Sequence, residues 1–159
     1  MSGSFGHILE VLTRHRVEFV VVGGVAAVLH GAPVTTFDLD ALIRVESRNA
    51  DRLLAALGEL DARFREHRQI LRPTREDILA GGHLLLLTNA GPFDVLGFIG
   101  KNSRYDDLRQ QSVRLSLDSG EIDVLSLDEL IRQKRIMGRD KDAPAIRMLE
   151  EVVRRRPKS

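Results

Sequence analysis

Asp38 and Asp40 are the residues of this sequence whose type and spacing most directly suggest chemistry. Residues i and i+2 of a β-strand project from the same face, and the intervening Phe37 and Leu39 would then point toward apolar packing. Two carboxylates held side by side repel each other, and a site that keeps both ionised usually binds a divalent cation through hard oxygen ligands. The pair therefore indicates Mg²⁺ or Mn²⁺, unless both residues are simply solvated at a strand end.

A glycine pair, Gly23-Gly24, precedes these aspartates and directly follows an apolar run at 17–22. Glycines at a strand-to-helix turn let backbone N–H groups approach a ligand, and a helix start favours phosphate. Two glycines alone match neither the dinucleotide pattern G-x-G-x-x-G nor the P-loop pattern G-x-x-x-x-G-K-[ST]. The turn nevertheless favours a ligand site over solvated strand-end carboxylates.

A metal site for phosphoryl chemistry normally uses a third carboxylate, which helps to take a proton from the attacking hydroxyl. Asp94 and Asp123 are the two candidates. Asp94 lies among apolar residues directly after a Gly-Pro turn, where a carboxylate without a partner would be costly. We therefore favour Asp94.

Cations that could face phosphates lie near the C-terminus. Lys134 falls on the same helical stripe as Leu130 and Ile131, and Arg139 and Lys141 follow it closely. These three cations could converge on a triphosphate. Lys134 could equally extend its ammonium group into water, and the other two could be ordinary charges at helix ends.

Composition excludes several classes of function. The chain has no cysteine, which removes disulfides, thiolate nucleophiles and cysteine-ligated metals. The five histidines lack ligand spacing, so zinc is not supported and we interpret them as surface or capping residues. Aromatic residues make up 4%, which leaves few platforms for stacking on RNA bases.

Charge and hydropathy point to a cytoplasmic protein without a membrane partner. Lys and Arg number 24 against 23 Asp and Glu, so any polyanionic partner must be held by a local patch. The C-terminal cluster Arg154-Arg155-Arg156 with Lys158 could contact RNA phosphates, or could simply complement a helix C-terminus. No signal sequence or membrane-spanning apolar run is visible.

Periodicity and turn signals predict the helices and strands that must position these residues. With 159 residues we expect one domain, 1–159. Its fold class is α/β (α+β): a mixed sheet flanked by helices, with a helix pair at the C-terminus. We expect helices at 5–16, 25–30, 47–60, 74–79, 105–110, 128–137 and after 142, strands at 17–22 and 37–45, and hairpins at 83–99 and 113–125. Ser47 or Asn49 is expected to cap the third helix, Asp140 or Asp142 the last one, and 63–75 reads as an edge strand or loop.

Three blocks of this sequence resemble the DNA polymerase β-like nucleotidyltransferase superfamily, and within it the small bacterial abortive-infection-type, toxin-like proteins. The blocks are Gly23-Gly24 through Thr36-x-Asp38-x-Asp40, then Gly91-x-x-Asp94-Val95-Leu96, then Leu130-Ile131-x-x-Lys134-x-x-x-Gly138-Arg139-x-Lys141-Asp142. The resemblance implies transfer of a nucleoside monophosphate from an NTP to an acceptor hydroxyl, with pyrophosphate leaving.

The resemblance also implies residue roles. Asp38 and Asp40 would hold both Mg²⁺ ions, Asp94 would complete the ion that activates the acceptor, and the glycine pair with Thr36 would face the phosphates. Lys134 would bind the triphosphate. One departure is Val34, where many relatives have arginine; Arg139, Lys141 or Arg44 is expected to supply the missing charge.

We therefore expect a Mg²⁺-dependent nucleotidyltransferase that acts on RNA (tRNA) or protein and serves as the toxin of a toxin–antitoxin pair with a cognate antitoxin. One alternative is a catalytically inactive module that binds a nucleotide or a partner. Another is an enzyme that modifies a small molecule such as an antibiotic. Fold alone does not select among these acceptors.

Overall fold

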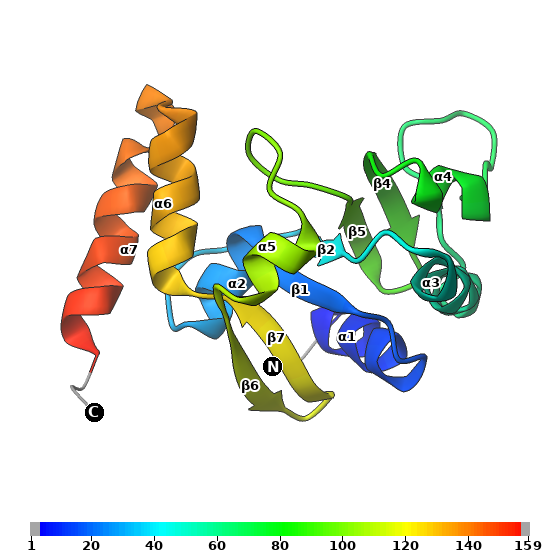
Figure 1. The fold of residues 1–159 in the computed structure, drawn as a ribbon, viewed down its shortest axis with the longest axis horizontal. Helices are drawn as coiled ribbons and strands as arrows, with labels where there is room; N and C mark the ends of the chain where they lie inside the picture. Colours follow the sequence, from blue (N-terminus) through cyan, green and yellow to red (C-terminus); the bar gives the residue numbers. More distant parts are fainter. Residues whose placement is uncertain (1–3, 157–159) are drawn as a thin grey trace.

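The structure is a computed structural model that describes residues 4–156. Helices and strands alternate along most of the chain (Figure 1). Their order is α1 (Ser4–Arg14), β1 (Phe19–Val22), α2 (Gly23–Leu29), β2 (Leu39–Ile43), α3 (Ser47–Glu59), β3 (Arg63–Phe64), α4 (Arg75–Leu79), β4 (His83–Thr88), β5 (Gly91–Leu96), α5 (Tyr105–Arg109), β6 (Ser112–Leu117), β7 (Gly120–Leu125), α6 (Leu127–Met137), the 3₁₀ turn η1 (Asp140–Asp142) and α7 (Ala143–Arg155).

The seven described strands form one mixed sheet in the order β3-β4-β5-β2-β1-β7-β6. β1 pairs antiparallel with β2, whereas β2 pairs parallel with β5 and β1 pairs parallel with β7. The two hairpins, β4–β5 and β6–β7, extend the sheet on either side. β2 is therefore the central strand, with three strands on each side.

Apolar patterning explains why these segments pack together. All four residues of β1 are buried, as expected for a strand covered on both faces. α1 contacts β7 and α3, while α5 contacts β1 and β7. α6 and α7 pack side by side at one end of the molecule (Figure 1). The structure thus confirms the expected mixed sheet, flanking helices and C-terminal helix pair.

Some expected boundaries are wrong. β2 begins at Leu39 and not at 37, because Phe37 is 76% exposed and does not join the apolar packing predicted for it. α3 is capped by neither Ser47 nor Asn49: the carboxylate of Glu46 accepts hydrogen bonds from the backbone N–H groups of Arg48 and Asn49. A carboxylate suits this position because it also complements the helix dipole.

Other local expectations are confirmed. Thr74 and Asp77 form the expected capping box at the start of α4, and Gly138 ends α6 in the left-handed conformation. The segment predicted as an edge strand or loop forms the two-residue strand β3, followed by an irregular stretch. Asp142 occupies the N-cap position of α7, but its side chain makes no capping hydrogen bond.

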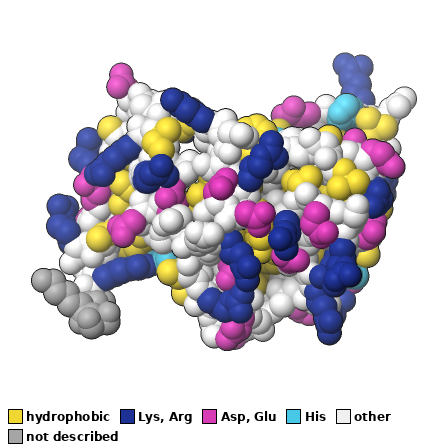
Figure 2. Space-filling view, viewed as in Figure 1, with side chains coloured by type: hydrophobic (Ala, Val, Ile, Leu, Met, Phe, Trp, Pro, Cys, Tyr) yellow, Lys and Arg dark blue, Asp and Glu magenta, His cyan; other side chains and the backbone are white. Residues whose placement is uncertain are grey.

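The surface carries mixed charge. Basic and acidic side chains are interspersed over the face seen in Figure 2, in line with the formal net charge of +1. Within residues 4–156, each helix is too short or too polar to traverse a lipid bilayer.

Candidate functional site

Two aspartates meet at the centre of the sheet. The parallel register of β2 and β5 makes Asp40 and Asp94 direct partners. The Asp94 side chain is only 15% exposed, and Oδ1 of each carboxyl group is buried without a hydrogen-bond partner. Burying a carboxylate oxygen without a hydrogen-bond partner costs free energy, so a bound cation or a proton would stabilise this pair.

Burial and a neighbouring negative charge perturb the titration of Asp40. Burial, followed by the charge of Asp94, raises the pKa of Asp40 from 3.8 to about 7. The carboxylate of Asp38 lies close enough to raise that pKa further. The three acidic residues singled out from the sequence therefore interact electrostatically around Asp40, although Asp38 lies just outside β2.

An arginine that the sequence did not single out lies against this pair. Nη2 of Arg65 lies 3.0 Å from Oδ1 of Asp94, an ion-pair distance, although the angles are not those of a hydrogen bond. Arg65 directly follows β3, the edge strand, and its contact with Asp94 depends on the pairing of β3 with β4. No spacing in the sequence could have revealed it, because this register is set by tertiary structure.

The glycine pair brings the start of α2 against β2. Gly23 has φ +69°, and a Cβ added there would lie 2.4 Å from Oδ2 of Asp40. At Gly24, an added Cβ would lie 2.6 Å from Oγ1 of Thr36. Only glycine allows these approaches, so the two positions are fixed by contact with the acidic strand and the loop before it.

A cavity of about 180 Å³ connects this acidic centre to the C-terminal helices. Gly23 and Asp40 line it on one side and Lys134 and Arg139 on the other. The remaining lining is mostly apolar, including Leu96, Ile99, Leu130 and Met137. The fold thus brings together four of the residues predicted for the site, from segments more than ninety residues apart. Gly24, Thr36, Asp38, Asp94 and Lys141 do not line this cavity.

The two cations that line the cavity are already engaged by a carboxylate. Arg139 Nε lies 2.6 Å from Oδ2 of Asp142, and Lys134 Nζ lies 4.0 Å from Oδ1 of the same residue. The Arg139 guanidinium, followed by the lysine charges, holds the pKa of Asp142 below its usual range, so Asp142 is ionised at neutral pH. Lys141 is exposed in η1. Lys134 and Arg139 thus meet at the cavity, where Asp142 partly neutralises both charges, and the binding of a triphosphate by these cations stays a prediction.

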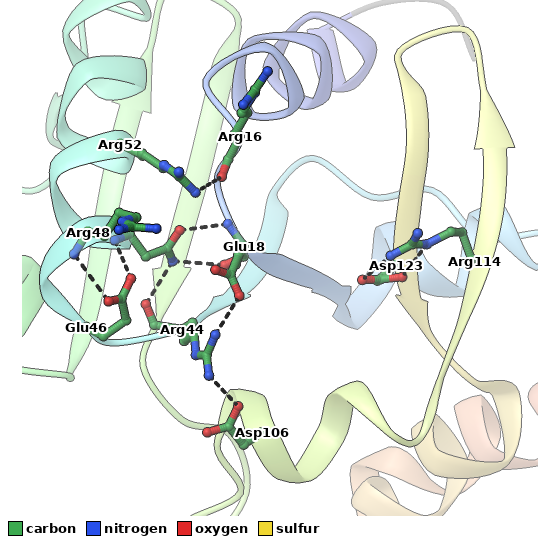
Figure 3. A network of polar contacts seen from close by, with 10 residues as sticks. Arg16, Glu18, Arg44, Glu46, Arg48, Arg52, Asp106, Arg114 and Asp123 are labelled. Carbon is green, nitrogen blue, oxygen red and sulfur yellow. Dashed lines mark hydrogen bonds and ion pairs between the residues drawn. The ribbon is translucent and has the colours of Figure 1, made fainter.

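Asp123 and Arg44 have ion-pair partners outside the acidic pair (Figure 3). Asp123, on β7, pairs with Arg114 at 3.1 Å across the β6–β7 hairpin. Arg44 pairs with Glu18 at 2.9 Å and reaches Asp106 at 3.7 Å. Asp94, and not Asp123, is therefore the carboxylate that lies beside Asp40, while Arg44 is engaged by other acidic residues and does not line the cavity.

Val34 packs partly buried against the hydrophobic core. An apolar side chain at this position is explained by that packing, and it supplies no positive charge to the cavity. Of the three cations expected to compensate, only Arg139 lines the cavity.

His30 and the C-terminal arginines have structural partners. His30 contacts the backbone carbonyl of Leu125 through Nε2 at 2.8 Å and the guanidinium of Arg156 through Nδ1. Burial lowers the pKa of His30, which fits a neutral ring that donates from Nε2 and accepts at Nδ1. Arg154 and Arg155 pair with Glu151, whereas Lys158 lies outside the described residues.

The donor chemistry of the acidic pair fits a hard divalent cation. Oδ1 of Asp40 is buried without a hydrogen bond, Oδ1 of Asp94 is buried with only the ion-pair contact to Arg65, and carboxylate oxygens are the ligands Mg²⁺ prefers. Within residues 4–156, however, no three or more acidic or histidine side chains already converge as a ligand set. The two paired aspartates are therefore the core of the candidate metal site, with Asp38 beside them.

Comparison with known proteins supports the fold. The chain is 19% identical to a candidate nucleotidyltransferase of Thermotoga maritima, with a TM-score of 0.57, covering 91% of this chain and 89% of that one. It is 17% identical to an antigenic nucleotidyltransferase-like protein of Paracoccidioides brasiliensis, with a TM-score of 0.55, covering 94% of this chain and 73% of that one. This chain has a nucleotidyltransferase fold. No protein-family model and no curated protein matches it.

Proposed function

We propose that this chain is a Mg²⁺-dependent nucleotidyltransferase, which moves a nucleoside monophosphate from an NTP to an acceptor hydroxyl and releases pyrophosphate. The observation that carries the proposal is the register-matched pair Asp40 and Asp94 beside Gly23, of which Asp40 lines one cavity together with Lys134 and Arg139. The shared fold is consistent with this reaction class.

Each residue has a chemical task in this proposal. Asp40 and Asp94, with Asp38, would hold Mg²⁺, which supplies charge neutralisation and lowers the pKa of a bound hydroxyl. Lys134 and Arg139 would bind phosphate oxygens once these compete with Asp142. The glycines leave the backbone of the strand-to-helix turn open to a ligand.

The cavity limits what it can hold. Its volume of about 180 Å³ is below the roughly 300–1,000 Å³ of pockets that enclose a whole small molecule. It therefore fits part of a nucleotide, with the rest exposed or covered by the acceptor. For the acceptor we propose an RNA (tRNA) or a protein, with a toxin role and a cognate antitoxin.

Transfer of label tests the reaction class. The purified protein is incubated with Mg²⁺, total RNA and cell extract, and with each NTP labelled at either the α or the γ phosphate. Movement of the α label to a macromolecule by the wild type and by Asp123→Asn, but not by Asp40→Asn, supports nucleotidyl transfer. Asp123→Asn is a matched control because it makes the same change at another partly buried carboxylate of the same sheet, one that pairs with Arg114 and lies outside the acidic pair. Movement of the γ label would identify a kinase-like reaction and contradict the proposal.

Expression in bacteria tests the toxin role. Induction of the wild type should arrest growth, whereas Asp40→Asn at equal abundance should not. Arrest by both proteins would show that any toxicity is independent of the acidic pair.

A second candidate, a nucleotide-binding module without transfer activity, is favoured by one observation. Asp142 engages both cations of the cavity, and Val34 supplies no charge. Mg²⁺-dependent binding of NTP to the wild type, with no transfer of either label, would support this candidate over the enzyme.

A further inference from the structure

The contact between Arg65 and Asp94 is built into the fold more firmly than a surface ion pair. The backbone N–H of Arg65 donates to the carbonyl of Leu85 at 3.0 Å, and Nη1 of its side chain donates to the carbonyl of Leu86 at 3.2 Å. These two bonds hold both ends of the residue along β4 while Nη2 faces Asp94.

Burial sets this arginine apart from the others. Its side chain is 25% exposed, whereas the other ion-paired arginines of the described residues are 39–80% exposed. Ion pairs at exposed positions contribute little, but a charge at a shielded position strongly affects neighbouring groups. Arg65 is thus placed to influence the acidic pair.

Arg65 supplies the positive charge that this pair otherwise lacks. Among the described residues, no other cation lies within ion-pair distance of Asp40 or Asp94. Leaving buried charges without compensation would be strongly destabilising. A divalent cation bound by the same carboxylates would supply that charge instead, and it would be repelled by the guanidinium.

We propose that Arg65 is a positioning residue of the candidate metal site: it fixes and compensates the Asp94 carboxylate when no metal is bound, and it competes with a divalent cation for that carboxylate. The inference rests on the proposed function, because it takes Asp40 and Asp94 as cation ligands. Arg65 itself touches neither the cation nor the nucleotide in this proposal.

Binding of Mn²⁺ tests the inference without any need for activity. Free Mn²⁺ is titrated into the purified full-length protein and followed by its electron paramagnetic resonance signal. Arg65→Met removes the charge and keeps much of the side-chain volume, and it is expected to bind Mn²⁺ about tenfold more tightly than the wild type, since removing a like charge favours cation binding. Arg65→Lys, which restores the charge, is expected to return the affinity to within about threefold of the wild type.

Arg114→Met is the matched control. Arg114 pairs with Asp123 at 3.1 Å on the same sheet, and Asp123 is 17% exposed against 15% for Asp94. Its loss should leave Mn²⁺ affinity unchanged. Thermal unfolding in EDTA provides a second measurement: Arg65→Met should unfold at a lower temperature than the wild type and should gain more from added Mn²⁺.

The possible outcomes are distinct. Equal Mn²⁺ affinity of the wild type and Arg65→Met, or weaker binding by the variant, overturns the inference and leaves the proposed function standing. No Mn²⁺ binding by either protein overturns the metal site, and with it both proposals. Binding of Mn²⁺ by Arg65→Met but not by the wild type supports the inference most strongly. Arg65→Gln is titrated in parallel, so that a failure of the methionine variant to fold still leaves a charge-free protein to measure.

Discussion

Replacing Asp40 by asparagine should stabilise the metal-free protein at alkaline pH. The pKa of Asp40 is raised from 3.8 to about 7 by burial and by Asp94, so ionising this group costs free energy in the folded state. Because the folded pKa lies above the unfolded one, the folded protein binds the proton more tightly. Ionisation of Asp40 therefore lowers the free energy of unfolding. This loss is absent below pH 3.8, grows as the pH rises toward 7 and is constant above that value.

The magnitude follows from the shift. The difference between a pKa of 3.8 and one of about 7 corresponds to roughly 4 kcal/mol of unfolding free energy. Because Asp40 is partly accessible to solvent, which screens the charge, we expect about half of this, near 2 kcal/mol. For a chain of this length, about 2 kcal/mol corresponds to a Tm difference of roughly 4–8 °C. Asparagine also offers an N–H donor to the Asp94 oxygen that lacks a hydrogen bond.

The assay is thermal unfolding in EDTA at pH 5.5 and 8.5. The advantage of Asp40→Asn over the wild type should be larger at pH 8.5, and added Mg²⁺ should raise the Tm of the wild type only, because a ligand that binds the folded state stabilises it. Asp123→Asn should unfold with the pH dependence of the wild type. A difference between Asp40→Asn and the wild type that is the same at both pH values would refute the reasoning.

Three further changes test other parts of the site. Gly23→Ala places a Cβ 2.4 Å from Oδ2 of Asp40 at a position with φ +69°. It should lower the free energy of unfolding, measured in urea, by about 1–3 kcal/mol. Gly58→Ala, where an added Cβ meets nothing within 4 Å, is the control and should not destabilise the protein. Asp142→Asn should release Lys134 and Arg139 and tighten NTP binding several-fold, measured by calorimetry. Asp140 is exposed nearby, and Asp140→Asn is the control. The same gain in affinity from both variants would show that only the overall charge matters. His30→Gln should flatten the loss of stability as the pH falls below 6.5, because burial lowers the pKa of His30 and the folded state therefore resists its protonation; an unaltered pH profile between 5 and 7 would contradict this.

Much of the fold follows from local signals in the sequence. The hairpins were predicted because glycine-containing turns at Asn89-Ala90-Gly91 and Asp118-Ser119-Gly120 separate apolar runs. Asp94 could be favoured over Asp123 because its neighbours are apolar, and the register of β5 with β2 places it beside Asp40. The catalytic roles of these residues stay predictions.

What could not be predicted depends on pairing between distant segments. Arg65 reaches Asp94 only through the two-residue strand β3, which is too short to leave a periodic signal. The sequence predicts Asp140 or Asp142 as the cap of the last helix, and Asp142 does occupy the N-cap position, but its carboxylate accepts a hydrogen bond from Arg139 and not from the helix backbone. Arg44 was considered for its charge alone, and its partners Glu18 and Asp106 come from other elements.

The strand order has a consequence for how the site opens. The carboxylates stand on β2 and β5 inside the sheet, whereas Arg65 follows β3 at its edge. Local unfolding starts where few hydrogen bonds hold the backbone, so the end of the sheet that carries the guanidinium should fray while the strands that carry the acids stay paired. In hydrogen exchange, the amide protons of Phe64 and Arg65 should therefore be lost well before those of Ala41 and Val95. The guanidinium could then leave Asp94 through small, frequent openings at the edge of the sheet, while the two carboxylates keep their places in the core.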